Sequence, residues 1–312
     1  MEAASRRQAG RKTKVLSLLL GLASTGAAAA QEGPRIAFAH EGDIWIMNAD
    51  GTGRSQLTFD PAQEFDPSLS PDGQWIAFRS HAGGDPQVHL IGTDGSAERN
   101  LTNSRFTDYS PAFSPDGTQI AFASDRAARG MNVWIMDADG TNLRQLTGIP
   151  GISEYPSWSP DGTRLVFHCT FGRVLESGTG DFEVCAANAD GTGLVHLTDA
   201  PGESKLPAWS PDGQWIAFAS DRHGWPSLPD YLPEGYDPQN FGDEDIYLMA
   251  PDGTGVRNLT QNPRQGETMP VWMGREIVFS RYGCLFAMNA EGGEARELTL
   301  GAPCADAFPD VR

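Results

Sequence analysis

The chain has 312 residues, 39% of them hydrophobic and 21% charged, with 36 Gly and 22 Pro. This length suits one large all-β domain or two ordinary domains. The formal net charge is −18 and the pI about 4.6. Because such a chain repels polyphosphate and anionic lipid, nucleic acid is excluded as a leading partner. Binding of cations, basic protein surfaces or neutral ligands is compatible with this negative charge.

Residues 1–30 have the features of an export signal. Five basic residues lie between Arg6 and Lys14, an apolar stretch follows from Val15 to about Leu22, and Ala28-Ala29-Ala30 fits the small-residue cleavage rule. The Leu-rich part is short for a membrane anchor, which needs about 20 apolar residues. We therefore expect cleavage before Gln31. The mature chain would keep 18 basic and 40 acidic side chains, a net charge of −22, with no transmembrane segment, and would be periplasmic or secreted.

A repeat accounts for residues 31–312. Ser-Pro-Asp-Gly occurs at 70–73, 114–117, 159–162 and 210–213, with a degraded copy at 272–275, and a short apolar run such as 75–78 follows each copy. A second landmark is Asp-Gly or Glu-Gly ahead of a polar stretch that ends in Leu-Thr, present six times. Since Asp-Gly favours tight hairpins, each unit of about 40–50 residues predicts four short strands, which we call a to d, the signature of a propeller blade.

The two ends of the chain complete one another. The first copy begins near Arg35 at strand b, whereas residues 308–312 match strand a only. We therefore predict an all-β, six-bladed β-propeller of four-stranded blades, closed by the C-terminal strand pairing with the N-terminal blade. Closure removes the open sheet edge.

The segment 66–78 (DPSLSPDGQWIAF) and Asn48-Ala49-Asp50-Gly51 resemble the repeats of TolB-like six-bladed propellers, a WD40-like Pro-Asp repeat family. The resemblance covers residues 34–312. It implies the propeller fold and a partner taken at the mouth of the central channel. Because few residues separate the expected signal from the first blade, we expect the N-terminal α/β domain of TolB to be absent.

The sequence has none of the common catalytic motifs. Gly-x-Ser-x-Gly, His-Glu-x-x-His and the phosphate-binding loop are missing. Asp137-Ala138-Asp139-Gly140 fails as a calcium loop, because the first and twelfth positions would be Ile135 and Leu146. The six His show no metal-ligand spacing. We expect no catalytic residue, and the metal content stays open.

Four cysteines in an exported chain favour disulfides. Cys169 and Cys185 fall at the end of strand b and in strand c of one blade, which suits a cross-strand bond. Cys284 and Cys304 fall on connections of the same face and would staple the ring closure. Buried free thiols are the alternative.

An acidic collar is predicted at one mouth of the channel. The residues three before each strand-a proline are Glu64, Asp108, Ser153, Ser204, Glu267 and Asp306, and Asp66 and Glu154 lie nearby. The collar would bind a cation such as Ca²⁺ or a basic partner segment. The alternative is a structural role in which each carboxylate accepts a local backbone N–H.

Two long insertions fall on the same face, Thr170–Glu183 and His223–Glu244. The second carries four aromatic residues suited to recognition, Trp225, Tyr231, Tyr236 and Phe241. A self-packed loop is the alternative. The leading interpretation is an exported, non-enzymatic module that binds a protein or cell-envelope partner at the channel mouth. The alternatives are a metal-dependent polysaccharide lyase or hydrolase-like propeller and a scaffold subunit.

Overall fold

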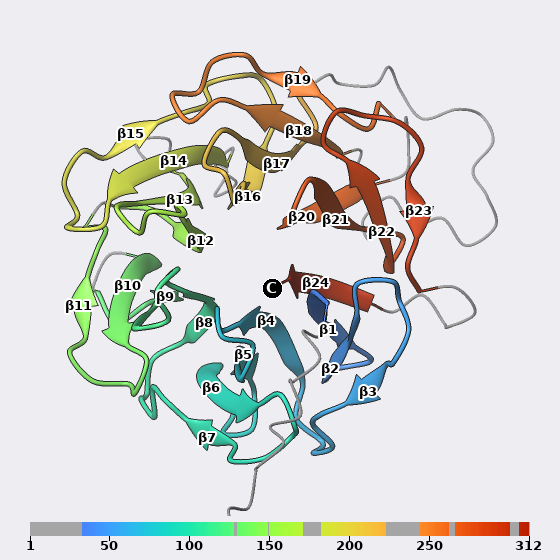
Figure 1. Ribbon diagram of the computed structural model, residues 1–312. Helices are drawn as coiled ribbons and strands as arrows, with labels where there is room; N and C mark the ends of the chain where they lie inside the picture. Colours follow the sequence, from blue (N-terminus) through green and yellow to red (C-terminus); the bar gives the residue numbers. More distant parts are fainter. Residues whose placement is uncertain are drawn as a thin grey trace, which may run out of the picture. The chain divides into compact units, whose positions relative to one another are not determined.

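The computed structural model describes residues 33–127, 130–148, 150–170, 182–222, 244–261, 266–299 and 306–311. Within these residues every regular element is a strand, and none forms a helix long and apolar enough to cross a bilayer. The strands form six four-stranded antiparallel sheets arranged around a central axis (Figure 1). The predicted six-bladed propeller is therefore confirmed.

The blades follow one another in chain order. The first has β1 (Arg35–His40), β2 (Asp43–Asn48), β3 (Ser55–Gln56) and β24 (Asp306–Val311). The second has β4 (Glu64–Leu69), β5 (Trp75–Ser80), β6 (Gln87–Gly92) and β7 (Arg99–Asn100). The third has β8 (Asp108–Phe113), β9 (Gln119–Ser124), β10 (Asn132–Asp137) and β11 (Arg144–Gln145). The fourth has β12 (Ser153–Trp158), β13 (Arg164–Cys169), β14 (Glu183–Asn188) and β15 (Val195–His196). The fifth has β16 (Ser204–Trp209), β17 (Ile216–Ser220), β18 (Asp245–Met249) and β19 (Arg257–Asn258). The sixth has β20 (Glu267–Met273), β21 (Glu276–Arg281), β22 (Cys284–Asn289) and β23 (Arg296–Glu297).

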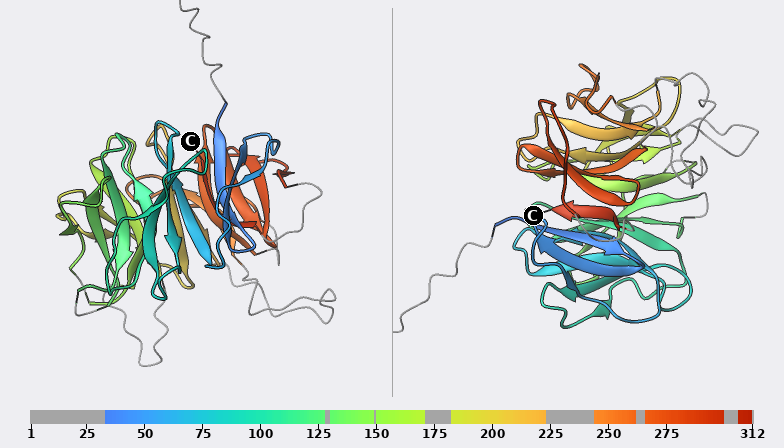
Figure 2. Two further views of the ribbon diagram at one scale, coloured as in Figure 1. Left: turned by 90° about the horizontal axis from the view of Figure 1, so that it is seen from below. Right: turned by 90° about the vertical axis from the view of Figure 1, so that its right-hand side faces the viewer.

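Closure of the ring occurs in the first blade. The sheet order is β24-β1-β2-β3, so the last strand of the chain pairs antiparallel with the first, with Ile36 opposite Val311. Figure 2 shows β24, in dark red, beside β1, in blue, where the first and last strands of the propeller meet. The predicted closure by the C-terminal strand is confirmed.

The apolar run of strand b and the Leu-Thr pair each have a structural role in the blade. The Phe of strand b is fully buried in all six blades, and the Leu of Leu-Thr is buried in five of them and partly buried in the other. In every blade the Thr hydroxyl accepts a hydrogen bond from the N–H of the second residue of strand c, for example Val184 N–H to Thr198 Oγ1 at 2.8 Å. The hydroxyl thereby satisfies a buried N–H where the short strand d has ended.

At five junctions between blades, neighbouring inner strands are joined by one of two kinds of hydrogen bond. Where the residue after the strand-a proline has an oxygen on its side chain, that oxygen accepts an N–H from the next inner strand. Where the residue is Ala, the Trp of the next inner strand donates its indole N–H to the Ala carbonyl. The bonds of the first kind are Leu69 N to Asp310 Oδ2 (2.6 Å), Phe113 N to Ser68 Oγ (3.2 Å) and Trp209 N to Ser157 Oγ (3.1 Å). Those of the second kind are Trp158 Nε1 to Ala112 O (3.1 Å) and Trp272 Nε1 to Ala208 O (3.0 Å).

Acid should destabilise the propeller through its turns. Hydrogen bonds from Ser or Thr side chains hold the pKa below 3.8 in a set of turn aspartates: Asp50, Asp72, Asp94, Asp116, Asp139, Asp161, Asp190, Asp212 and Asp252. A carboxyl whose pKa is lower in the folded state stabilises that state above its unfolded pKa and loses this effect as pH falls. We therefore expect the urea midpoint to fall as pH drops through about 3.8.

The variant Asp116→Asn provides the control. It should be less stable than the wild type at pH 7, and the gap between the two midpoints should narrow with acidification. A gap that stays constant from pH 7 to pH 2.5 would contradict this account.

Candidate functional site

A β-bulge in each inner strand aims one side chain at the channel. The residue directly before each strand-a proline has a positive φ between 51° and 56°, and the strand register shifts there. Positive φ is costly for residues other than Gly, and bulges commonly redirect a side chain. The six residues are Asp66, Ser110, Tyr155, Leu206, Met269 and Phe308, and all line the central cavity.

The central cavity has a volume of about 550 Å³ and is lined from all six blades. The strand-a prolines and the prolines of the Ser-Pro-Asp-Gly turns supply much of its wall, together with Trp158, Trp209 and Trp272. Only two of the lining residues are carboxylates, Asp66 and Asp310. The cavity is therefore mostly apolar, with few polar groups, as small binding sites usually are.

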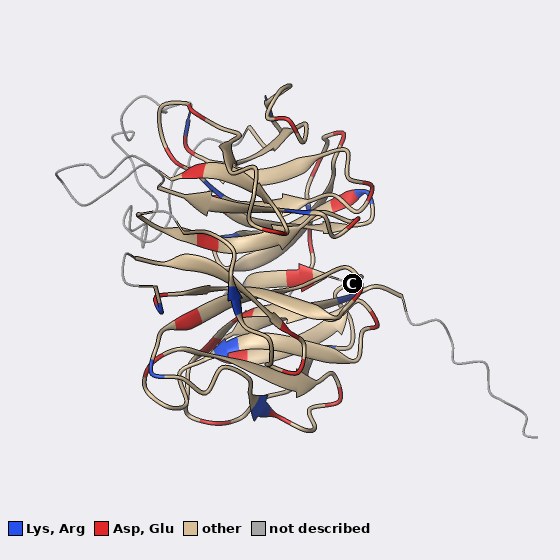
Figure 3. Ribbon diagram, turned by 90° about the vertical axis from the view of Figure 1, so that its left-hand side faces the viewer, with Lys and Arg blue, Asp and Glu red and all other residues tan. Residues whose placement is uncertain are grey.

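The residues of the predicted acidic collar do not share one environment. Glu64, Asp108 and Glu267 are 0% exposed and do not line the cavity; Asp108 and Glu267 instead pair with arginines, Arg126 and Arg281. The inner strand alternates its side chains and then bulges, so the residue three before the proline packs inside the propeller, whereas the one directly before it faces the axis. Figure 3 shows the acidic residues, in red, spread along the blades and turns.

The other predicted collar residues have different positions. Asp66 lines the cavity, and Glu154 lies beside it, close to His168. The backbone of Asp306 pairs with His40 at the start of β24. Among the collar carboxylates Glu64, Asp66, Asp108, Glu154 and Glu267, the structure thus places Asp66 on the channel wall.

An arginine close to Asp66 and Phe308, two residues of the cavity wall, lies among aromatic rings. Arg79 Nε lies 3.2 Å from Asp66 Oδ2, and its guanidinium lies 4.8 Å from the ring centre of Phe65, 5.7 Å from Tyr109 and 5.8 Å from Phe308. Such cation–π contacts gain strength where water is scarce. We call Phe65, Asp66, Arg79, Tyr109 and Phe308 the Arg79 cluster.

The aromatic surface continues toward the fourth blade. Tyr155 stacks on Phe308 with ring centres 6.5 Å apart and planes at 8°, and the His168 ring lies 5.1 Å from Tyr155. Leu206 N–H donates to His168 Nδ1 at 3.3 Å, which places the ring proton on Nε2. That nitrogen faces Glu154 Oε2 at 3.6 Å. The rings are thus held by packing and by backbone contacts from two blades.

Burial sets the protonation of these groups. It raises the pKa of Asp66 to about 6, although the Arg79 charge acts in the opposite direction. Burial and the nearby carboxylates raise the pKa of Tyr109 and Tyr155 well above their usual range. Both phenols therefore stay protonated near neutral pH and can donate hydrogen bonds, whereas they are unsuited to act as bases.

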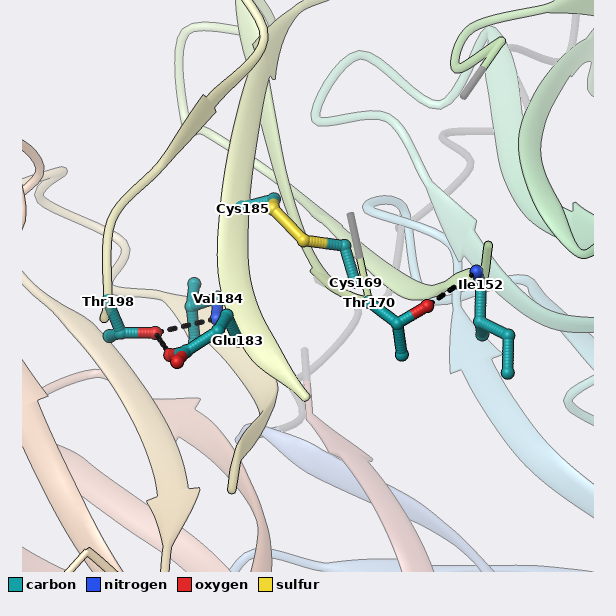
Figure 4. The surroundings of a disulfide bond; sticks show 7 residues. All are labelled: Ile152, Cys169, Thr170, Glu183, Val184, Cys185 and Thr198. Carbon is teal, nitrogen blue, oxygen red and sulfur yellow. Dashed lines mark hydrogen bonds between the residues drawn. A yellow bond between two sulfur atoms is a disulfide. The ribbon is translucent and has the colours of Figure 1, made fainter. Parts of the chain in front are cut away.

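A disulfide joins strands b and c of the fourth blade. Cys169 ends β13 and Cys185 lies in β14, with Cα atoms 6.0 Å apart (Figure 4). Since both thiols are bonded to each other, the nearby His196 does not complete a metal site with them. Closing a loop of this length stabilises a fold by about 3 kcal/mol.

Several predicted features lie outside the described residues. Cys304, the expected partner of Cys284, is among them, so that pairing stays a prediction. The same holds for Trp225, Tyr231, Tyr236 and Phe241 of the second insertion. The sequence reasoning missed Arg79, Tyr109, Tyr155 and Phe308. For Tyr155 and Phe308 the sequence held one signal, because the residue before the strand-a proline differs in all six blades whereas the proline is repeated.

Comparison with known proteins agrees with the fold. The TolB beta propeller domain family matches residues 97–173. A tricorn protease homolog from Streptomyces coelicolor is 40% identical over 60 residues, which is 19% of this chain and 5% of that protein. The match thus spans only a small part of that relative.

Solved structures extend the similarity to the whole propeller. A protein described as TolB from Agrobacterium tumefaciens superposes with a TM-score of 0.65 at 19% identity, over 85% of this chain and 88% of that one. TolB from Acinetobacter baumannii gives 0.65 at 18% identity, over 89% and 66%. Hydrazine synthase from Kuenenia stuttgartiensis gives 0.70 at 16% identity, over 89% and 46%. At these identities the likeness concerns the fold alone.

Proposed function

We propose that this TolB-like six-bladed propeller is an exported, non-catalytic binding module that receives a segment of a protein partner at the channel end occupied by the Arg79 cluster. The observation that carries the proposal is the set of six bulged residues. Each blade keeps a strained backbone to present one side chain to the axis, and the six side chains differ. If these residues served only to line the channel, we would expect similar side chains at all six positions.

The chemistry of the channel end indicates the kind of segment. Aromatic faces from Tyr155 and Phe308 suit apolar or cationic side chains, and Asp66 supplies a carboxylate beside them. The excess of acidic residues over the chain steers a basic partner toward the protein. We therefore expect the bound segment to carry Lys or Arg next to an apolar residue.

Peptide selection tests this proposal. Random peptides displayed on phage are selected on the purified protein, and the affinities of the enriched peptides are measured by fluorescence anisotropy. Binding should weaken tenfold or more in Tyr155→Ala and in Asp66→Asn, because truncating a central contact costs about 1.4 kcal/mol or more.

The control is Val195→Ala on the outer strand β15, where the side chain is 46% exposed. It should bind the same peptides with unchanged affinity. Failure to enrich any peptide, or equal binding by all three variants and the wild type, would refute the proposal.

A further inference from the structure

One buried carboxylate differs from its counterparts in the other blades. Glu64 is the first residue of β4, is 0% exposed, and accepts no hydrogen bond at either carboxylate oxygen from the described residues. Leaving an ionised carboxylate buried without a partner is strongly unfavourable. Something outside the described protein atoms must satisfy it, or it must lose its charge.

The sister blades show how this position is normally satisfied. Asp108 pairs with Arg126, which lies two residues beyond strand b, and Glu267 pairs with Arg281, which lies opposite it on strand b. In the blade of Glu64, the corresponding positions hold Ser80 and Ala82. Neither of the two positions that hold an arginine in those blades holds a basic residue here. Glu64 therefore lacks the positively charged partner that Asp108 and Glu267 have.

Two further carboxylates converge on the same place. One ligand oxygen from each of Asp60, Glu64 and Glu98 lies within 4.8 Å of the others. Asp60 belongs to the connection from β3 to β4, and Glu98 precedes β7, so three segments meet there. Glu98 is oriented by His89, whose Nδ1 lies 3.0 Å from Glu98 Oε1.

In the absence of a cation, the ionised form of Glu64 is disfavoured, as its pKa shows. Burial raises its pKa to about 7, and the charges of Asp60 and Glu98 add to the shift. The nearby Thr58 hydroxyl lowers the pKa of Glu64, but it is not placed to donate a hydrogen bond to either carboxylate oxygen.

We propose that Asp60, Glu64 and Glu98 bind one Ca²⁺ ion, which replaces at this blade the arginine found in its sisters. Carboxylate oxygens are hard donors and favour Ca²⁺, Mg²⁺ or Mn²⁺. Two oxygens on one ion can be no farther apart than twice the metal–oxygen distance, about 5 Å for Ca²⁺ and about 4.2 Å for Mg²⁺. The separations of at most 4.8 Å between these oxygens lie within the limit for Ca²⁺. The site is separate from the channel and independent of the proposed peptide binding.

Thermal unfolding of the purified protein in EDTA and in CaCl₂ tests the site, with calorimetric titration of CaCl₂ as the direct measurement. An ion that binds only the folded state raises the midpoint by mass action. With Ca²⁺ at a hundred times its Kd, we expect a rise of about 5 °C. Glu64→Gln should abolish both the rise and the binding heat.

Two comparisons separate an ion site from a structural role. In EDTA, Glu64→Gln should be as stable as the wild type or more so, because it removes an unpaired buried charge. Glu267→Gln, the matched control, should be destabilised in both buffers by weakening its ion pair with Arg281, yet should keep the calcium-dependent rise. No rise in the wild type, a rise that persists in Glu64→Gln, or equal binding of Mg²⁺ would overturn the proposal.

Discussion

Replacing Arg126 with Met should lower the free energy of unfolding by about 3–5 kcal/mol, the cost of leaving a buried charge without its partner. Arg126 Nη2 lies 2.5 Å from Asp108 Oδ2, and the two side chains are 10% and 0% exposed. The guanidinium also lies over the rings of Phe122 and Trp134, at 5.4 and 5.6 Å. Urea unfolding at pH 7 measures the loss.

Arg222 provides a matched control within the same protein. It occupies the corresponding position in the fifth blade, but its partners are the hydroxyls of Ser204 and Ser220, at 2.9 and 3.1 Å. Its replacement by Met leaves no buried charge, so the expected loss is about 1–2 kcal/mol. The double variant Arg126→Met/Asp108→Leu should recover much of the loss, because both charges are gone. Equal losses for Arg126→Met and Arg222→Met would contradict the argument.

Deleting residues 306–312 should abolish cooperative unfolding of the propeller. The deletion removes β24, leaves the edge of β1 open and uncovers the core around Ile36 and Phe38, to which Val311 contributes. An open hydrophobic edge strand invites association with other chains. We expect aggregation on size-exclusion chromatography, together with loss of the near-UV circular dichroism signal.

Two further measurements make this test specific to closure. A synthetic peptide with the sequence of residues 306–312 should restore the signal when added in excess, whereas a scrambled peptide should not. The point variant Asp310→Ala, which leaves the buried Leu69 N–H without its acceptor, should cost about 1–3 kcal/mol. A truncated chain that stays monomeric with an unchanged midpoint would show that closure contributes little.

The propeller could be predicted from the sequence because its information is local and repeated six times. Asp-Gly pairs determine where the chain turns, and Leu-Thr marks the end of each outer strand, where the Thr hydroxyl satisfies a buried N–H. The mismatch between the two chain ends also predicted the closing strand, because a lone strand a requires three partners. The turn residues and the number of strands in each repeat were sufficient to predict the blades and the closing strand.

The site depends on interactions that no local pattern displays. The bulge before the strand-a proline decides that Asp66 faces the channel and Glu64 does not, although both are acidic and two residues apart. Asp108 pairs with an arginine two residues beyond strand b and Glu267 with one on strand b, whereas Glu64 has neither partner. Which carboxylates are buried, paired or available to a ligand is a property of the packed blades, because burial and charge pairing join residues that are distant in sequence.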